Sequence, residues 1–230
     1  MKNLLSLLAL TATLSAVNPA SNMKLAFSDE FDGAALDPSK WAQAPYSPAG
    51  TVVVKDGKLT LGMAKVADGQ WKGGVVTSRG KFEQAQGYFE ASIKAGAVQG
   101  HHLGFVLPPR DKKELYAEIY VAAAFGDDKV VCWVRYNDGN SLKDEKPAPP
   151  IAPFSGGAAH KEFHTYGVLW KAKELTWYID GKEVFSTKKV VAKDPATLSL
   201  IHTVSEFEVP KLDPSKLPDD VQFDWVKVWK

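Results

Sequence analysis

The 230-residue chain has only one cysteine and almost no net charge, since 28 lysine and arginine residues face 27 aspartate and glutamate residues. A single cysteine cannot form an internal disulfide, so we expect Cys132 to be a buried, unreactive thiol and the fold to depend on packing. The balanced charge gives no reason to expect nucleic acid or an anionic membrane surface as a partner. No apolar run reaches the ~20 residues that span a bilayer, so we expect no membrane span.

The first 20 residues predict a secretion signal peptide. One early lysine precedes an apolar run from Leu4 to Val17, and small residues follow as far as Ala20, which is the order of a signal's charged, apolar and cleavage regions. A buried N-terminal helix is the alternative, but the run lacks polar faces at helical spacing. We therefore expect a signal peptide over residues 1–20, one domain over residues 24–230, and a secreted or periplasmic monomer.

Short extended segments predict an antiparallel β-sandwich. Runs rich in Val, Phe, Tyr and Trp recur between turn residues, and Asp-Gly in "KDGKL" and "IDGKEV" is the strongest short signal for a hairpin. Residues 143–160, "KDEKPAPPIAPFSGGAAH", predict a long loop that is either functional or merely connecting.

Three segments resemble glycoside hydrolase family 16. They are "FSDEFDGAALDPSKW", "GGVVTSRGKFEQAQGYFEASIKA" and "EFHTYGVLWKAKELTWYIDGKEV", followed by the C-terminal "DWVKVW". The match runs in order from about Leu25 to the end of the chain. The resemblance implies an all-β, concanavalin-like jelly roll of two curved antiparallel sheets, with a concave cleft that binds a polysaccharide such as a β-glucan or galactan. It implies no required cofactor.

The family's catalytic signature, Glu-x-Asp-x-x-Glu, aligns with "EIYVAAAFG" at residues 118–126. The resemblance places Glu118 on the nucleophile, Tyr120 on the central Asp and Ala123 on the general acid/base. Alternation puts residues i and i+2 on one face of a strand, and a bulge absorbs the extra residue before the third position. Because alanine has no proton to donate, we expect hydrolysis to be lost or strongly reduced.

A second alignment remains open. "ELYAE" keeps two glutamates at the spacing of the signature's shorter form, which would make Glu114 the nucleophile and Glu118 the acid, with Tyr116 in the Asp place. Glu206 and Glu208 in "VSEFEV" are further conceivable sources of the missing acid.

Several side chains are candidates for sugar contacts. The resemblance suggests Arg79 near the cleft and Arg135 where a histidine is common, with Val106 replacing a tryptophan. Trp71 and Trp133 are candidates for stacking on a pyranose ring, because a planar indole covers apolar C–H surface. The predicted substrate-binding residues are therefore Arg79, His101, His102, Trp71, Trp133 and Arg135.

Two metal predictions complete the site. We expect no metal at His101 and His102, which should border the cleft, because no cysteine or carboxylate stands at ligand spacing in the sequence. The resemblance implies a possible structural calcium, because Asp224 matches a family calcium ligand and Glu30 is near it in the same scheme.

Three functions follow from these residues. The first is a polysaccharide-binding protein whose hydrolysis of O-glycosyl bonds is lost or strongly reduced. The second is an active retaining endo-β-glycosidase with a non-standard acid/base. The third is a structural, envelope-associated β-sandwich without a sugar ligand.

Overall fold

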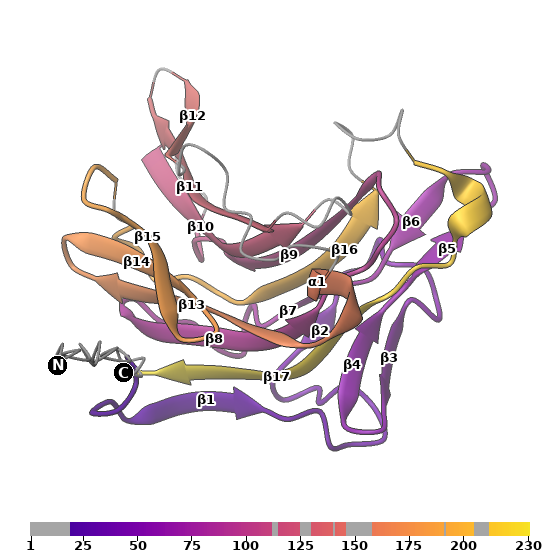
Figure 1. Ribbon diagram of the computed structural model, residues 1–230, viewed down its shortest axis with the longest axis horizontal. Helices are drawn as coiled ribbons and strands as arrows, with labels where there is room; N and C mark the ends of the chain where they lie inside the picture. The colour runs from indigo at the N-terminus through magenta and orange to yellow at the C-terminus, as the bar shows by residue number, and fades with distance from the viewer. Residues whose placement is uncertain are drawn as a thin grey trace, which may run out of the picture.

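Two antiparallel β-sheets stack face to face in the computed structural model (Figure 1). The structure describes residues 19–111, 115–124, 130–139, 141–145, 158–190, 192–204 and 212–230. Within these ranges, helical structure is limited to α1 (Ala158–Lys161) and the 3₁₀ turn η2 (Pro214–Lys216), and no helix is long and apolar enough to cross a membrane. The predicted all-β jelly roll is confirmed.

The first sheet, here called the β8 sheet, has eight described strands in the order β15-β14-β13-β8-β17-β4-β3, with β1 also paired to β17. Their bounds are β15 Lys182–Thr187, β14 Glu174–Ile179, β13 His164–Lys171, β8 Gly87–Lys94, β17 Val221–Trp229, β4 Lys58–Leu61, β3 Val52–Lys55 and β1 Leu25–Asp29.

The second sheet, here called the β10 sheet, has seven described strands in the order β12-β11-β10-β9-β16-β7-β2. Their bounds are β12 Leu142–Glu145, β11 Val130–Asp138, β10 Leu115–Ala124, β9 His101–Leu107, β16 Ser199–Val204, β7 Val75–Thr77 and β2 Ala42–Gln43. A separate hairpin joins β5 (Met63–Lys65) to β6 (Trp71–Gly73).

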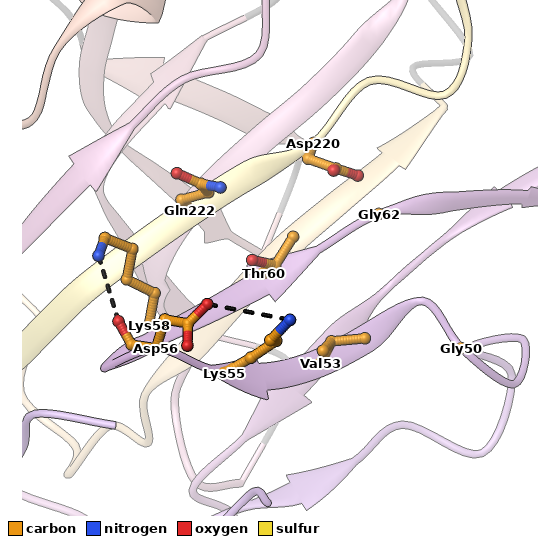
Figure 2. Close-up of a pocket in the computed structure, with 9 residues that line it drawn as sticks. All are labelled: Gly50, Val53, Lys55, Asp56, Lys58, Thr60, Gly62, Asp220 and Gln222. Atoms are coloured by element: carbon orange, nitrogen blue, oxygen red, sulfur yellow. Dashed lines mark hydrogen bonds and ion pairs between the residues drawn. The ribbon is translucent and has the colours of Figure 1, made fainter. Parts of the chain in front are cut away.

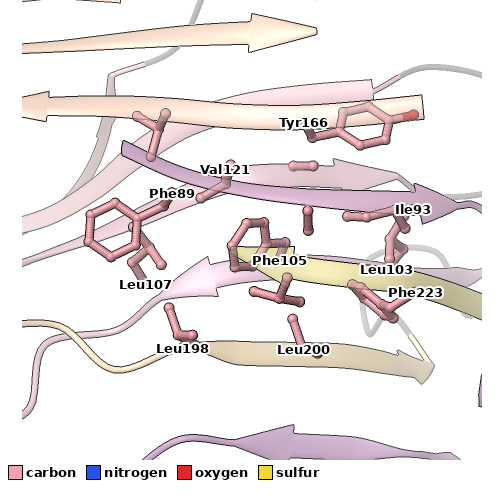
Figure 3. Close-up of a cluster of buried hydrophobic side chains, with 14 of the residues drawn as sticks. Phe89, Ile93, Leu103, Phe105, Leu107, Val121, Tyr166, Leu198, Leu200 and Phe223 are labelled. Atoms are coloured by element: carbon pink, nitrogen blue, oxygen red, sulfur yellow. The ribbon is translucent and has the colours of Figure 1, made fainter. Parts of the chain in front are cut away.

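The hydrophobic core fills the space between the sheets (Figure 3). Phe89 and Phe223 come from the β8 sheet and Phe105 and Leu200 from the β10 sheet, and all four are fully buried. Each such side chain stabilises the fold by roughly 1.5–3 kcal/mol through removal of apolar surface from water. Cys132 is buried in the same core, where burial raises the pKa of its thiol, as expected for an unreactive cysteine.

Strand β17 shows how the sequence keeps one face in the core. Val221, Phe223, Val226 and Val228 are buried, but their spacing changes from two residues to three in the middle. A bulge between Phe223 and Trp225 absorbs the additional residue. The two-residue alternation therefore resumes in phase with the core on the far side of the bulge.

Both predicted Asp-Gly hairpins are confirmed. Asp56 and Gly57 join β3 to β4 with φ values of 53° and 68°, and Asp180 and Gly181 join β14 to β15 with φ values of 48° and 71°. Two successive positive φ values match the right-handed twist of the flanking strands, which explains why Asp-Gly is favoured there.

Replacement of Gly57 by alanine is expected to lower the free energy of unfolding by about 1 kcal/mol. The reason is the backbone conformation, since a Cβ at Gly57 would meet only Asp32 Oδ1, at 3.7 Å. Urea denaturation measures this loss. Asp56→Asn is the control, because asparagine tolerates positive φ, and an equal loss in that variant would contradict the explanation.

Candidate functional site

A bulge in β10 sets the positions of the three aligned residues. Tyr120 pairs with Val106 of β9, but Ala122 then pairs with Phe105 and Ala123 with Gly104. Val121 and Ala122 both belong to the core between the sheets, whereas Ala123 packs with Tyr120 in a separate cluster. The bulge therefore returns position 123 to the face of Tyr120, the face of the β10 sheet that points away from the core.

Glu118 and Tyr120 interact directly on this face. The Tyr120 hydroxyl donates a hydrogen bond to Glu118 Oε2 at 3.3 Å. Burial, and secondly the charge of Glu118, raise the pKa of Tyr120. The phenol therefore stays protonated and donates to the carboxylate, in the place where the family signature has an anionic aspartate.

Ala123 lies within a small apolar cluster. Ala123 is fully buried, and Val106, Tyr120 and Trp133 of the same cluster are each less than a tenth exposed. The Trp133 ring stacks on Tyr120 with ring centroids 4.0 Å apart and planes at 10°. The position aligned with the general acid is thus surrounded by hydrocarbon, and Tyr120 covers one face of the predicted stacking residue Trp133.

Arg135 lies beside Glu118 but is paired elsewhere. Glu118 pairs across the sheet with Arg135, which pairs in turn with Asp144 of β12. The guanidinium donates to both Asp144 oxygens, at 2.9 and 3.2 Å, and this contact is the main cause that raises the pKa of Arg135. Its Cζ also lies 5.6 Å from the centroid of the Tyr120 ring. The outward face of the β10 sheet therefore carries the alternating charges of Glu118, Arg135 and Asp144, here called the Glu118 row. These side chains can hydrogen-bond to a polar ligand.

Trp177 of β14 supports the bulge from the opposite sheet. Its indole Nε1 donates a hydrogen bond to the Tyr120 carbonyl at 2.9 Å, and the Trp177 side chain is fully buried. A bulge interrupts the regular ladder and leaves backbone groups that need another partner. Trp177 supplies that partner across the core.

The structure separates the two histidines that were expected to border the cleft. His102 lies on the Tyr120 face, with its ring centroid 6.3 Å from that of Tyr120, and burial is the main cause that lowers its pKa to about 4. His101 instead points to the other side of β9 and is fully buried. The prediction for His101 is therefore wrong, because neighbouring residues in a strand face opposite sides.

Arg79 and Trp71 occupy different surroundings from the Glu118 row. The Arg79 guanidinium donates to the carbonyl of Arg110 at 2.5 Å and to that of Pro109 at 3.4 Å. Arg79 thus links the turn after β7 to the segment after β9. Trp71 is half-buried in the β5–β6 hairpin, outside the β10 sheet.

Three alternative acids lie outside the described residues. Glu114, Glu206 and Glu208 belong to the ranges for which no structure is given. The alignment that makes Glu114 the nucleophile therefore stays a prediction.

The calcium prediction receives no support from side-chain geometry. Glu30 forms an ion pair with Lys227 at 2.9 Å, which already offsets its charge. Among the described residues, neither Glu30 nor Asp224 belongs to a group of three metal-binding side chains. These two carboxylates alone do not supply the six to eight oxygens of a calcium site, so calcium stays a prediction.

A carboxylate does approach the buried histidine. His101, His202 and Asp219 form the one group of three potential metal-binding side chains in the described part of the chain. The expectation from the sequence concerned only carboxylates at ligand spacing along the chain, whereas this carboxylate approaches His101 in space. The spacing of residues along the chain gave no signal, because Asp219 follows far downstream and reaches His101 only in the folded protein.

A surface cavity lies on the other sheet, the β8 sheet. Its volume is about 510 Å³, and Figure 2 shows that β3, β4 and the start of β17 form it. Its lining is Gly50, Val53, Lys55, Asp56, Lys58, Thr60, Gly62, Asp220 and Gln222. None of these residues offers an aromatic ring for stacking on a sugar, and the charged side chains Lys55 and Asp56 pair with each other at 4.0 Å. In the sequence alone, these residues have the pattern of an ordinary solvent-exposed hairpin, so the pattern gave no sign of this cavity.

Known proteins share both the sequence pattern and the fold. Beta-porphyranase E from Zobellia galactanivorans is 29% identical over 239 residues, covering 87% of this chain and 85% of that protein. The crystal structure of SCLam, a non-specific endo-β-1,3(4)-glucanase, matches with a TM-score of 0.80 and 18% identity over 94% of each chain. A laminarinase from Flavobacterium sp. UMI-01 matches with a TM-score of 0.73 and 18% identity, covering 90% of this chain and 100% of that one.

The family model for glycosyl hydrolases family 16 matches residues 40–227. This range includes β10 and the three aligned positions on its outward face. It also includes most of the strands of both sheets. The chain therefore belongs to glycosyl hydrolases family 16.

Proposed function

We propose that this protein binds a β-linked polysaccharide, a β-glucan or a galactan, on the outward face of the β10 sheet, with little or no hydrolysis. The observation that carries the proposal is the buried, apolar setting of Ala123 at the position of the general acid. Without a proton donor there, the leaving sugar oxygen would depart as an alkoxide.

The chemistry of retaining hydrolysis supports the proposal. That mechanism needs a carboxylate nucleophile and a carboxylic acid about 5 to 5.5 Å apart. Glu118 supplies the first group, but Tyr120 directs its hydroxyl at Glu118 and retains its proton because its pKa is raised. Loss of acid assistance typically lowers the rate by 10² to 10⁴.

Retained polar groups favour a sugar ligand over a surface without one. Glu118, Arg135 and Asp144 form a row across β10, β11 and β12, where they can exchange hydrogen bonds with sugar hydroxyls. The names of the similar proteins also describe enzymes that act on β-glycans. For this chain we therefore propose the binding of β-glycans but not their hydrolysis.

The test is binding and hydrolysis by the purified chain on one panel of laminarin, mixed-linkage β-glucan and porphyran. We expect retarded migration in gels that contain the bound glycan, with no release of reducing ends. Glu118→Gln should alter binding only modestly, because glutamine keeps the shape and can still accept a hydrogen bond.

Two outcomes would contradict the proposal. Release of reducing ends that disappears in Glu118→Gln would favour an active glycosidase with another acid. Absence of binding to every glycan in the panel would favour the structural alternative.

We also propose that the chain is exported. N-terminal sequencing of the mature protein tests this proposal.

A further inference from the structure

The Glu118 row presents hydrogen-bond acceptors on both sides of one donor. Glu118 and Asp144 are carboxylates, which accept hydrogen bonds, and Arg135 between them donates. The Tyr120 hydroxyl satisfies only one oxygen of Glu118. A ligand that displaces water from the other carboxylate lone pairs must therefore donate to them. A sugar hydroxyl can do so, because it both donates and accepts.

Asp144 occupies the fork of the Arg135 guanidinium. Its two carboxylate oxygens accept from Nε at 2.9 Å and from Nη2 at 3.2 Å. Two parallel bonds of this kind are the strongest way in which arginine binds a carboxylate or a phosphate, and a sulfate ester has oxyanions of the same type. A sulfate ester would have to displace Asp144 from the fork. A sugar hydroxyl needs only one of the further N–H groups of the guanidinium, so it can bind beside Asp144.

Two aromatic rings hold the same guanidinium in place. Arg135 Cζ lies 5.6 Å from the centroid of the Tyr120 ring and 6.0 Å from that of Trp133. The face of an aromatic ring attracts a cation at such distances. Asp144 and the two rings together therefore fix Arg135 in the row before any ligand binds.

The described strands of the β10 sheet hold no further cation on this face. Arg135 is their only arginine and Lys143 their only lysine. Lys143 pairs with Tyr136, the neighbour of Arg135, so it belongs to the opposite face of the sheet. Arg79 follows β7 and donates to backbone carbonyls outside the row. The row therefore sets two carboxylates against one guanidinium.

We propose that the bound glycan carries no sulfate ester where it crosses the Glu118 row, and that Asp144 determines this selectivity by holding Arg135. The inference rests on the proposed glycan binding and narrows the ligand to an uncharged β-glycan at this place. A sulfate ester accepts hydrogen bonds but cannot donate them, so it would face Glu118 and Asp144 without a bond to either. The like charges would also repel one another.

The test is the affinity of the purified chain for glycans that are matched except for sulfate. The pairs are laminarin with chemically sulfated laminarin, and desulfated porphyran with porphyran, and affinity gels measure the dissociation constants. We expect the wild-type chain to bind the unsulfated member of the recognised pair roughly 10-fold more tightly, because like charges oppose binding of the other. Added sodium chloride should reduce this difference, because salt screens charges that are open to solvent.

Replacement of Asp144 by asparagine should change the selectivity. The variant keeps the size of the side chain, removes one negative charge and frees Arg135 for a sulfate ester. We expect the ratio of the two affinities to shift by roughly 10-fold toward the sulfated glycan, as one added hydrogen bond between charged groups would cause. The double variant Arg135→Gln/Asp144→Asn should lose this shift, because no cation remains in the row. If Asp144 only stabilised the fold, both affinities would fall together and their ratio would stay constant.

Asp56→Asn is the matched control. It removes the same charge from the exposed turn between β3 and β4 on the other sheet, so the affinity ratio should stay at the wild-type value. Tighter binding of the sulfated glycan by the wild-type chain would overturn the inference but leave the proposed glycan binding intact, whereas no binding of any of these glycans would contradict both. An unchanged ratio in Asp144→Asn would overturn the role of Asp144. The wild-type comparison decides the selectivity even if a variant does not fold.

Discussion

Replacement of Ala123 by glutamate is expected to lower the free energy of unfolding by roughly 3–5 kcal/mol at pH 8, because it places a charge without a counter-ion at a buried site. Ala123 is fully buried, and Val106, Tyr120 and Trp133 surround it. Burial would raise the pKa of the new carboxyl above its unfolded value of about 4.3. The loss of stability that the charge causes is therefore complete when the pH is above the pKa of this carboxyl in the folded chain. It becomes smaller as the pH falls toward the pKa in the unfolded chain. Urea denaturation at pH 8 and pH 5 measures both effects.

Ala123→Gln separates volume from charge at this position. Glutamine has nearly the same size as glutamate but does not titrate. Ala123→Gln should therefore lower the free energy of unfolding less than Ala123→Glu does at pH 8, and its loss relative to wild type should not vary with pH. Equal stability of the two variants at pH 8 would show that position 123 is accessible to water.

The double variant Tyr120→Asp/Ala123→Glu restores the residues of the family signature at both positions. It should release reducing ends faster than Tyr120→Asp alone, by a factor of up to about 10² to 10⁴.

Replacement of Trp177 by phenylalanine is expected to lower the free energy of unfolding by about 2–3 kcal/mol. The change removes the N–H that satisfies the Tyr120 carbonyl and leaves unfilled volume in the core. The bulge should loosen, so we also expect weaker glycan binding and altered fluorescence of the Tyr120–Trp133 stack. Urea denaturation and the glycan gels measure these effects.

Trp170→Phe is the matched control for Trp177. Trp170 is also buried in the β8 sheet, and its Nε1 donates to the Ala192 carbonyl at 3.0 Å, away from the bulge. The two variants should lose similar stability, but only Trp177→Phe should weaken glycan binding. An equal loss of binding in both variants would contradict a specific role of Trp177 in positioning Tyr120.

Local patterns predicted the strands and the hairpins correctly. Alternation of buried and outward residues, as at Val226 and Val228, depends only on the geometry of an extended chain. The Asp-Gly turns depend only on local backbone preferences, as the positive φ values of Gly57 and Gly181 show. Such features need no knowledge of distant residues.

The contacts that surround the candidate site could be identified only in the folded chain. The alignment identified Glu118, Tyr120 and Ala123, but it did not show that Trp133 stacks on Tyr120. It also gave no sign that Trp177 reaches the bulge from the opposite sheet. These contacts join strands that the sequence separates, so local spacing carries no information about them.

By itself, the sequence determined the strand-rich architecture, the two hairpins and the absence of a carboxyl group at position 123, because each depends on residue identity or on neighbours along the chain. Only the tertiary structure decided that His101 turns away from the Glu118 face and meets Asp219. The pairing of β9 with β16 and the approach of the segment before β17 bring these groups together, and burial then lowers the pKa of His101.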